Sequence, residues 1–143
     1  MTGFKNIDSF KKRLKKRLGK DATGNIKSAM FRSTKVVQSK AISSVSMPGA
    51  GRDRGDGTRA SAPGQPPATD SGVLRNGITT DLVVEQDALV GQIIAYAPAN
   101  GGNYAIHLEF GTRYMDARPF MQPALRQSAK KVKNIFKKEG IIR

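Results

Sequence analysis

The stretch 47–71 constrains the fold more than any other part of this chain. It is rich in Gly, Pro and small polar residues and holds almost nothing that a core could bury. A loop of this length in a compact domain is either functional or disordered until it binds a partner. The core must therefore come from the flanking segments, and Arg52, Arg54 and Arg59 suit the stretch to reaching a neighbouring subunit or a phosphate backbone.

The segment before this loop predicts two helices. In residues 4–18 an apolar residue recurs at every third or fourth position, with basic residues on the other faces, which is the pattern of an amphipathic helix. Gly19 is a natural stop for it. A second helix is expected from about Thr23 to Val45, although its Ser, Thr and β-branched residues make it intrinsically weak, so that packing must hold it.

The segment after the loop predicts a hairpin and then two helices. Residues 78–84 and 88–96 are rich in β-branched residues and are separated by a short polar connection. Both faces of the second run are partly apolar, so we expect a central strand or one covered on both sides. Residues 97–102 read as a loop. Tyr104–Phe110 reads as a short helix ended by Gly111, and Pro119 and Pro123 precede or open the last helix.

These elements together predict an α+β fold in a single domain, 1–143. We expect N-terminal helices, a small antiparallel sheet built on the hairpin, a short helix, and a C-terminal helix packed on the sheet. The core is modest, with three Tyr, six Phe and no Trp. An oligomeric partner would help to cover the remaining apolar surface.

Positive charge is concentrated at the two ends of the chain. The formal net charge is +14, and most of the excess lies in residues 1–20 and 126–143. Such charge attracts nucleic acid or an acidic protein surface, or it merely solvates two helix faces. The N-terminal segment lacks the apolar core of a signal peptide, and no run of apolar residues is long enough to span a membrane. We therefore expect a protein that is neither exported nor membrane-spanning.

Catalytic, metal-binding and cofactor-binding patterns are missing from the sequence. There is no Cys, and the single histidine, His107, lies two residues from Glu109 with no third ligand nearby. Asp53, Asp56 and Asp70 lack the spacing of a calcium loop. The glycine pairs of the loop neither follow a strand nor precede Gly-Lys-Ser/Thr, so they do not form a phosphate cradle. We expect no enzyme activity, no metal and no cofactor.

Two blocks of residues resemble a known family. The first runs from Pro63 to Ile78 and reads Pro-Gly-Gln-Pro-Pro, followed by Ser-Gly-Val-Leu-Arg-Asn-Gly-Ile; Gly77 stands where a Ser is common. The second comprises Tyr104-Ala105, Glu109-Phe110-Gly111-Thr112 and the run Arg-Pro-Phe-Met-Gln-Pro-Ala-Leu at 118–125. They resemble the neck proteins of long-tailed bacteriophages, including the tail-completion, gpZ-like minor tail proteins. The likeness covers roughly residues 63–138.

The resemblance implies a structural virion protein at the head–tail junction. Copies would assemble as a ring, a hexamer like the tail, at the head-proximal end of the tail, completing it and joining it to the head around the DNA channel. The partners implied are the head-completion or stopper protein, the tail terminator, the tail tube, and DNA that passes through the lumen without sequence specificity. The protein would be found in the host cytoplasm during assembly and then in the virion neck, with no membrane contact.

Two groups of residues carry these expectations. Subunit or partner contacts are expected at Arg52, Arg54, Arg59, Glu109, Arg113 and Arg118. Glu109 would pair with Arg113 or Arg118, brace the loop locally, or reach a neighbouring subunit. Gly72 and Gly111 suit turns with positive φ, and Phe110, Phe120 and Leu125 would pin the helices over the hairpin. The fold signature is Gly72, Leu74, Tyr104, Phe110, Gly111, Pro119, Phe120 and Pro123.

Three alternatives remain open at this point. A tail terminator does an adjacent job in the same neck. A non-virion nucleic-acid-binding protein would account for the charge, although no aromatic stacking platform and no helix-turn-helix or zinc finger is visible. A membrane-surface role of the basic amphipathic segment 4–18 is the third.

Overall fold

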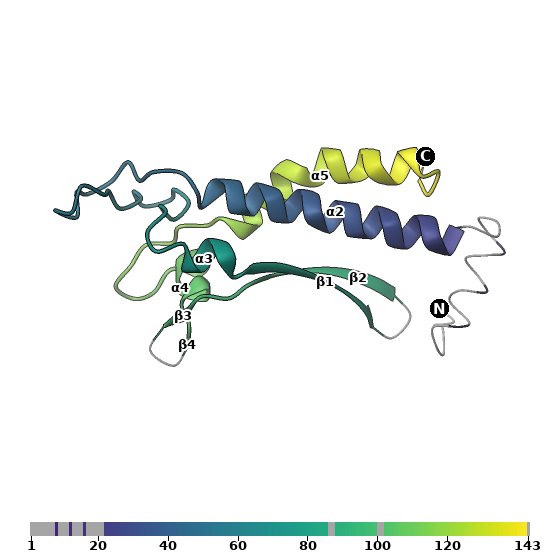
Figure 1. Cartoon of the computed structure of the whole chain (residues 1–143), viewed down its shortest axis with the longest axis horizontal. Helices are drawn as coiled ribbons and strands as arrows, with labels where there is room; N and C mark the ends of the chain where they lie inside the picture. Colours follow the sequence, from purple (N-terminus) through teal and green to yellow (C-terminus); the bar gives the residue numbers. More distant parts are fainter. Residues whose placement is uncertain are drawn as a thin grey trace. The chain divides into compact units, whose positions relative to one another are not determined.

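The computed structural model describes residues 22–85, 88–99 and 102–142, together with Asp8, Lys12 and Lys16. The helix expected over 4–18 lies outside these residues except for those three, which are helical and exposed. Figure 1 shows the elements. In chain order they are α2 (Ala22–Ser44), α3 (Val73–Asn76), β1 (Ile78–Glu85), β2 (Ala88–Ala95), β3 (Pro98–Ala99), β4 (Gly102–Asn103), α4 (Tyr104–Phe110) and α5 (Met121–Lys138).

The α+β fold expected from the sequence is confirmed. The long helix α2, the short helix α4 and the hairpin strands β1 and β2 have nearly the predicted bounds. The strands β1 and β2 pair with each other in a two-stranded sheet. The last helix, α5, begins two residues after Pro119. Its third residue is Pro123, and proline is tolerated there because the first N–H groups of a helix have no partner within it.

The described residues belong to two compact units, and each is described by itself. Unit 1 is formed by residues up to 36, by 80–92 and by the chain from 129 onward. Unit 2 is formed by residues 37–79 and 93–128. The boundaries fall within α2, β1, β2 and α5, so each of these elements contributes to both units.

In unit 1, the first part of α2 packs directly on the hairpin. A Cβ atom added to Gly91 of β2 would lie 2.3 Å from Cγ2 of Thr34 and 3.1 Å from the sulfur of Met30, so only glycine permits this approach. Ile26 and Ala29 are the buried apolar residues on this part of α2. Arg32 forms an ion pair with Glu139, which follows α5. These contacts join α2 to the hairpin and to the C-terminal part of the chain.

The main hydrophobic core lies in unit 2. Its largest fully buried side chain is Phe120, which immediately precedes α5. Gln38 of α2 donates a hydrogen bond of 2.7 Å to the carbonyl of Ile78, which fastens the start of β1 to the helix. The buried residues of this core are Ala41, Val45, Ile78, Ala97, Ala105, Leu108, Phe120 and Ala124.

Residues 97–102 were expected to be a loop, and this expectation is wrong in detail. Strands β3 and β4 pair antiparallel, with Pro98 opposite Asn103 and Ala99 opposite Gly102. Asn103 organises this turn, because its side-chain oxygen accepts hydrogen bonds from the N–H groups of Ala97 (2.9 Å) and Ala105 (3.1 Å). It is also the N-cap residue of α4. One side chain therefore ends the hairpin and begins the helix.

The structure decides between the two positions expected for the second hairpin strand, central or covered on both sides. In the described part of the chain β2 pairs only with β1, so it is not a central strand. Its residues are half-buried on both faces, and Ile94 is 44% exposed. The apolar residues on both faces indicated coverage, but they do not distinguish a strand paired on both edges from a strand covered by helices and loops.

The short helix α3 was not expected from the sequence. Gly72 precedes it with φ of 79°, and Gly77 follows it. A Cβ atom at Gly77 would lie 1.7 Å from the carbonyl oxygen of Tyr96. A glycine at position 77 thus has a structural reason in this chain, because the backbone of residue 96 passes too close for any side chain. The N–H of Tyr96 donates to the carbonyl of Gly77 at 3.0 Å.

Candidate interaction site

Glu109 holds the start of α5 in place. Its carboxylate accepts hydrogen bonds from the N–H groups of Phe120 (2.9 Å), Met121 (3.0 Å) and Gln122 (2.9 Å). These N–H groups belong to the first turn of the helix and have no acceptor within it. A negative charge at this end also complements the helix dipole. Of the roles expected for Glu109, the local brace is therefore the one observed, and no described residue forms an ion pair with it.

The turn between Glu109 and α5 is closed by backbone contacts. Gly111 has φ of 76°, as expected for a glycine in this turn, and a Cβ atom there would lie 2.8 Å from the carbonyl oxygen of Met115. The N–H of Arg118 donates to the carbonyl of Leu108 at 2.7 Å. Residues 104–122 therefore form one braced segment that carries most of the second resemblance block.

An open apolar groove of about 370 Å³ lies beside this braced segment in unit 2. Phe120, which is fully buried, is one of its lining residues. Three lining side chains are exposed: Ile106 at 54%, Phe110 at 78% and Leu125 at 56%. The lining residues are Val37, Ile93, Ala95, Ala105, Ile106, Glu109, Phe110, Phe120, Met121, Gln122 and Leu125. We call this feature the apolar groove.

Of the three side chains expected to pin the helices over the hairpin, the expected packing is confirmed for one and wrong for two. Phe120 is buried in the core as expected, but Phe110 and Leu125 project into solvent. Helical periodicity placed Phe110 and Leu125 on apolar stripes, and periodicity cannot reveal how much of a stripe the rest of the chain covers. The exposed pair is what makes the groove apolar at its rim.

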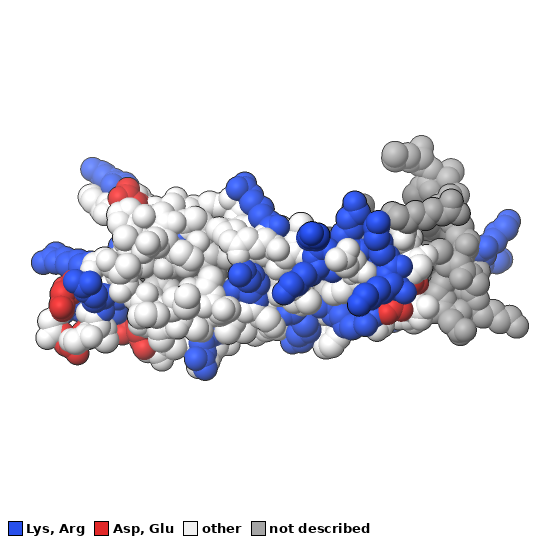
Figure 2. Space-filling view, turned by 90° about the horizontal axis from the view of Figure 1, so that it is seen from above, with Lys and Arg blue, Asp and Glu red and all other residues white. Residues whose placement is uncertain are grey.

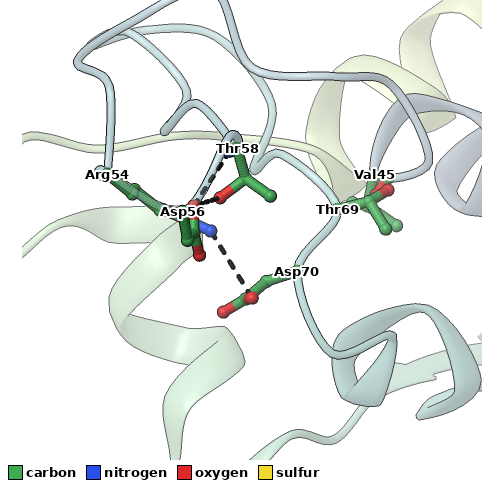
Figure 3. A network of polar contacts seen from close by, with 6 residues as sticks. All are labelled: Val45, Arg54, Asp56, Thr58, Thr69 and Asp70. Carbon is green, nitrogen blue, oxygen red and sulfur yellow. Dashed lines mark hydrogen bonds and ion pairs between the residues drawn. The ribbon is translucent and has the colours of Figure 1, made fainter.

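A second, more polar cavity of about 280 Å³ lies elsewhere in unit 2. Three arginines and one aspartate, Asp70, contribute to its wall. The side chains of Arg54 and Asp70 approach to 3.6 Å, as Figure 3 shows. Its lining residues are Val45, Arg54, Ser61, Pro67, Ala68, Asp70, Ser71, Gly72, Val73, Leu74, Arg75, Ala97, Pro98, Ala99, Tyr104, Leu108 and Arg118. We call this feature the polar cavity.

The stretch 47–71 has a defined backbone path in unit 2. Residues 51–60 double back on themselves, with Asp53 bridged to Arg59 and the N–H of Gly51 donating to the carbonyl of Ala60 at 2.8 Å. Thr69, near the C-terminal end of the stretch, fastens it to the residue that follows α2, because the Thr69 hydroxyl donates to the carbonyl of Val45 at 2.8 Å (Figure 3). We call residues 51–60 the finger. Its shape could not be read from a composition of glycine and small polar residues.

Asp56 at the tip of the finger makes the turn. Its carboxylate accepts from the hydroxyl of Thr58 (2.5 Å) and from the N–H of Thr58 (2.9 Å), as Figure 3 shows. The hydroxyl bond, and after it the N–H bond, lower the pKa of Asp56 below its ordinary value of 3.8. The local geometry thus belongs to the turn and not to a calcium loop. Among the described residues no cluster of potential metal ligands occurs.

The structure divides the residues singled out from the sequence among these features. Gly72, Leu74, Tyr104, Arg54 and Arg118 line the polar cavity. Glu109, Phe110 and Phe120 line the apolar groove. Arg52 and Arg59 are exposed on the finger. The guanidinium of Arg113 lies 5.0 Å from the ring centroid of Tyr114, which is 86% exposed. Pro119 and Pro123 flank Phe120 around the start of α5.

The contributions of two residues to these sites were missed from the sequence. Ile106 lies four residues before Phe110, a spacing that indicates stacking of the two side chains on one helix face, yet it is exposed at the groove. Ser61 was part of a loop with nothing to bury, yet it is 4% exposed and lines the polar cavity. No pattern could have found Ser61, because a lone serine in a loop has neither periodicity nor motif.

Exposed cations gather on the helices of unit 1. Figure 2 shows Lys and Arg side chains concentrated on the face formed there by α2 and α5. The exposed ones on the described parts of these helices that belong to unit 1 are Lys27, Arg32, Lys35, Lys130, Lys131, Lys133, Lys137 and Lys138. No described helix is long and apolar enough to cross a membrane.

Comparison with known proteins adds no relative. No family model, no curated protein and no solved structure matches the chain.

Proposed function

We propose that this chain is a structural protein of the neck of a long-tailed bacteriophage. The proposal starts from the two resemblance blocks, and the exposure of Phe110 is the observation that carries it furthest. A phenylalanine that served only to pack the fold would be buried, whereas Phe110 is 78% exposed at the rim of an apolar groove. Contiguous exposed apolar surface in a protein of this size marks a contact with another molecule.

In this proposal the contact is with a second copy of the chain. Copies form a ring, a hexamer matching the tail, and each neighbour covers the apolar groove of the next. A heterologous contact of this kind closes into a ring when its rotation is right. The ring completes the head-proximal end of the tail, around the DNA channel, and joins it to the head. It contacts the tail terminator, the tail tube and the head-completion or stopper protein.

The finger is a second surface that the proposal assigns to contacts with other molecules. Arg52 and Arg59 are exposed on the finger, where they are available to an acidic neighbour or to a phosphate backbone. Replacing both with Ser leaves the fold intact, since neither side chain is buried, but weakens head–tail joining. Full infectivity of that double variant would remove the finger from the proposal.

The test is electron microscopy of lysates made by a phage in which this gene is interrupted. Separate DNA-filled heads and free tails of normal length are expected. Over-long tails would instead assign the chain as a tail terminator, which is the nearest alternative. Intact, joined virions would contradict any neck role. Size-exclusion chromatography of the purified protein complements this test, because a ring elutes far ahead of a 15.5 kDa monomer.

The cations of unit 1 favour a second candidate, a nucleic-acid-binding protein outside the virion. The cationic face of α2 and α5 (Figure 2) would neutralise phosphates, and such binding falls steeply with salt whatever the DNA sequence. Sequence-selective binding that survives about 0.2 M salt would favour this candidate. Non-selective binding alone is compatible with a ring around DNA.

A further inference from the structure

Unit 1 carries its positive and negative charges on different elements. Residues 76–112 contain no Lys and no Arg, although the chain has 25 of them, so that an even spread would place several there. The hairpin segment 80–92 of unit 1 lies inside this stretch, and its sequence has three acidic residues, Asp81, Glu85 and Asp87. The helices α2 and α5 of the same unit carry the exposed cations (Figure 2). The two kinds of charge are therefore segregated within one compact unit.

The cationic face, which consists of the exposed Lys and Arg of α2 and α5 in unit 1, is little neutralised within the described chain. Arg32 pairs with Glu139. No described residue forms an ion pair with Lys130, Lys133 or Lys137. These three lysines recur at the spacing that aligns side chains along one face of a helix, and all three are exposed. They form a row of positive charge that is open to a partner.

The hairpin has the opposite charge and lacks the usual protection of exposed strands. Within the part of the chain that the structure describes, β1 and β2 pair only with each other, so both are edge strands. Edge strands commonly carry Lys, which discourages other chains from approaching, but neither β1 nor β2 has one. Asp81 is exposed, and none of the described cations forms an ion pair with it. The negative charge of the hairpin is therefore available to another molecule.

The hairpin and the cationic face lie on opposite sides of unit 1. Gly91 of the hairpin packs against Met30 and Thr34, which fixes the side of α2 that the hairpin covers. The hairpin lies below α2 in Figure 1, whereas Figure 2 looks at the molecule from above and shows the cations gathered on that upper side. Complementary surfaces on opposite sides of a subunit do not meet within one copy, but they meet when copies associate head to tail.

We propose that the cationic face of one copy binds the hairpin 80–92 of the next copy. Charge complementarity identifies this occupant, because the hairpin belongs to the one long stretch of the chain that has acids and no cations. Such complementarity speeds the encounter of two proteins and fixes their orientation. The inference rests on the proposal that copies assemble head to tail. It adds a salt-sensitive contact in unit 1 to the apolar contact at the groove of unit 2.

The test is a charge exchange between the two surfaces, followed by sedimentation velocity of the full-length protein at about 0.05 M salt, where screening is weak. The helix variant carries Lys130→Glu and Lys133→Glu. The hairpin variant carries Asp81→Lys and Glu85→Lys. Each variant alone is expected to self-associate about tenfold or more weakly than the wild-type protein, because attraction at the contact becomes repulsion.

Mixing the two variants separates a lost contact from a lost fold. In an equimolar mixture the acidic helices of one variant meet the basic hairpin of the other, so association is expected to return, and a misfolded variant could not restore it. The matched control reverses two exposed cations of unit 2, Lys40→Glu and Arg75→Glu, and should associate like the wild-type protein. A mixture that associates no better than its components would overturn the proposal, and so would a wild-type protein that stays monomeric.

Duplex DNA of about 20 base pairs provides a further arm, because a row of lysines also suits a phosphate backbone. A helix variant that self-associates normally but loses affinity for the duplex would overturn the proposal and assign the cationic face to nucleic acid. The phage experiment decides the neck role separately. Free heads and tails together with normal self-association of both charge variants would keep the neck role and remove this contact.

Discussion

The carboxylate of Glu109 lies 2.9 Å from the backbone nitrogen of Phe120, and this contact links the end of α4 to the first turn of α5. It explains how the two halves of the second resemblance block work together. The carboxylate caps the helix, and the helix start in turn holds the Phe120 ring in the core. Glu109 therefore has a structural role at the start of α5.

Removing the Glu109 charge should destabilise the fold. Glu109→Gln is expected to lower the free energy of unfolding by about 1–2 kcal/mol, because it weakens three N–H contacts and the favourable dipole interaction. Urea unfolding followed by circular dichroism measures the change. Asp116→Asn is the matched control, an exposed acid on the same connection, and should change stability by less than about 0.5 kcal/mol. Equal effects of the two substitutions would show that the cap contributes little.

The exposed rim of the apolar groove should matter for association but not for folding. The double substitution Phe110→Gln and Leu125→Gln is expected to change unfolding free energy by no more than about 1 kcal/mol, since both side chains are largely solvated. Self-association, measured by sedimentation velocity, should fall strongly. Phe120→Ala is the contrasting variant, because this ring is fully buried and its removal should cost about 3–5 kcal/mol. A double variant that assembles normally would exclude the groove as a subunit contact.

Replacing two glycines with alanine, one at a time, should change the stability of the protein in opposite directions. Gly77→Ala would place a Cβ atom 1.7 Å from the carbonyl oxygen of Tyr96, and a loss of about 1–3 kcal/mol is expected as the backbone shifts. Gly24→Ala, in α2 with nothing within 4 Å of the added atom, should gain up to about 1 kcal/mol. Thermal unfolding of both variants measures this pair. An unchanged thermal midpoint in Gly77→Ala would mean that the backbones of residues 77 and 96 lie further apart than described.

The finger tip should show its own pH dependence. The hydrogen bonds from Thr58 favour the charged form of Asp56, so its pKa lies below the ordinary 3.8. The stabilisation of the turn is therefore present at neutral pH and is lost as pH falls below 3.8 through the lowered pKa. Carboxyl-detected NMR titration of Asp56 measures this, and Thr58→Ala should return the pKa towards its ordinary value. An identical pKa in the variant would show that the hydroxyl bond is not the cause.

The resemblance blocks illustrate how much of the structure could be predicted from the local sequence. It located Gly111 as a turn residue with positive φ and Phe120 as a core residue, and both are confirmed. It could not choose between the roles considered for Glu109, because a helix N-terminus and a guanidinium are both good partners for a carboxylate. Only the path of residues 111–120 brings the start of α5 within hydrogen-bonding distance.

The sequence by itself determined the α+β class, the hairpin, and the helices α2, α4 and α5, because hydrophobic periodicity and turn residues are local properties. The tertiary structure alone decided which apolar side chains stay exposed, since burial depends on what segments distant in the chain cover. Phe110 and Phe120 have the same side chain, yet one is 78% exposed and the other is fully buried. For the same reason, the cavity lined by Ser61 and Arg118 exists only once residues 57 positions apart in the chain are folded together.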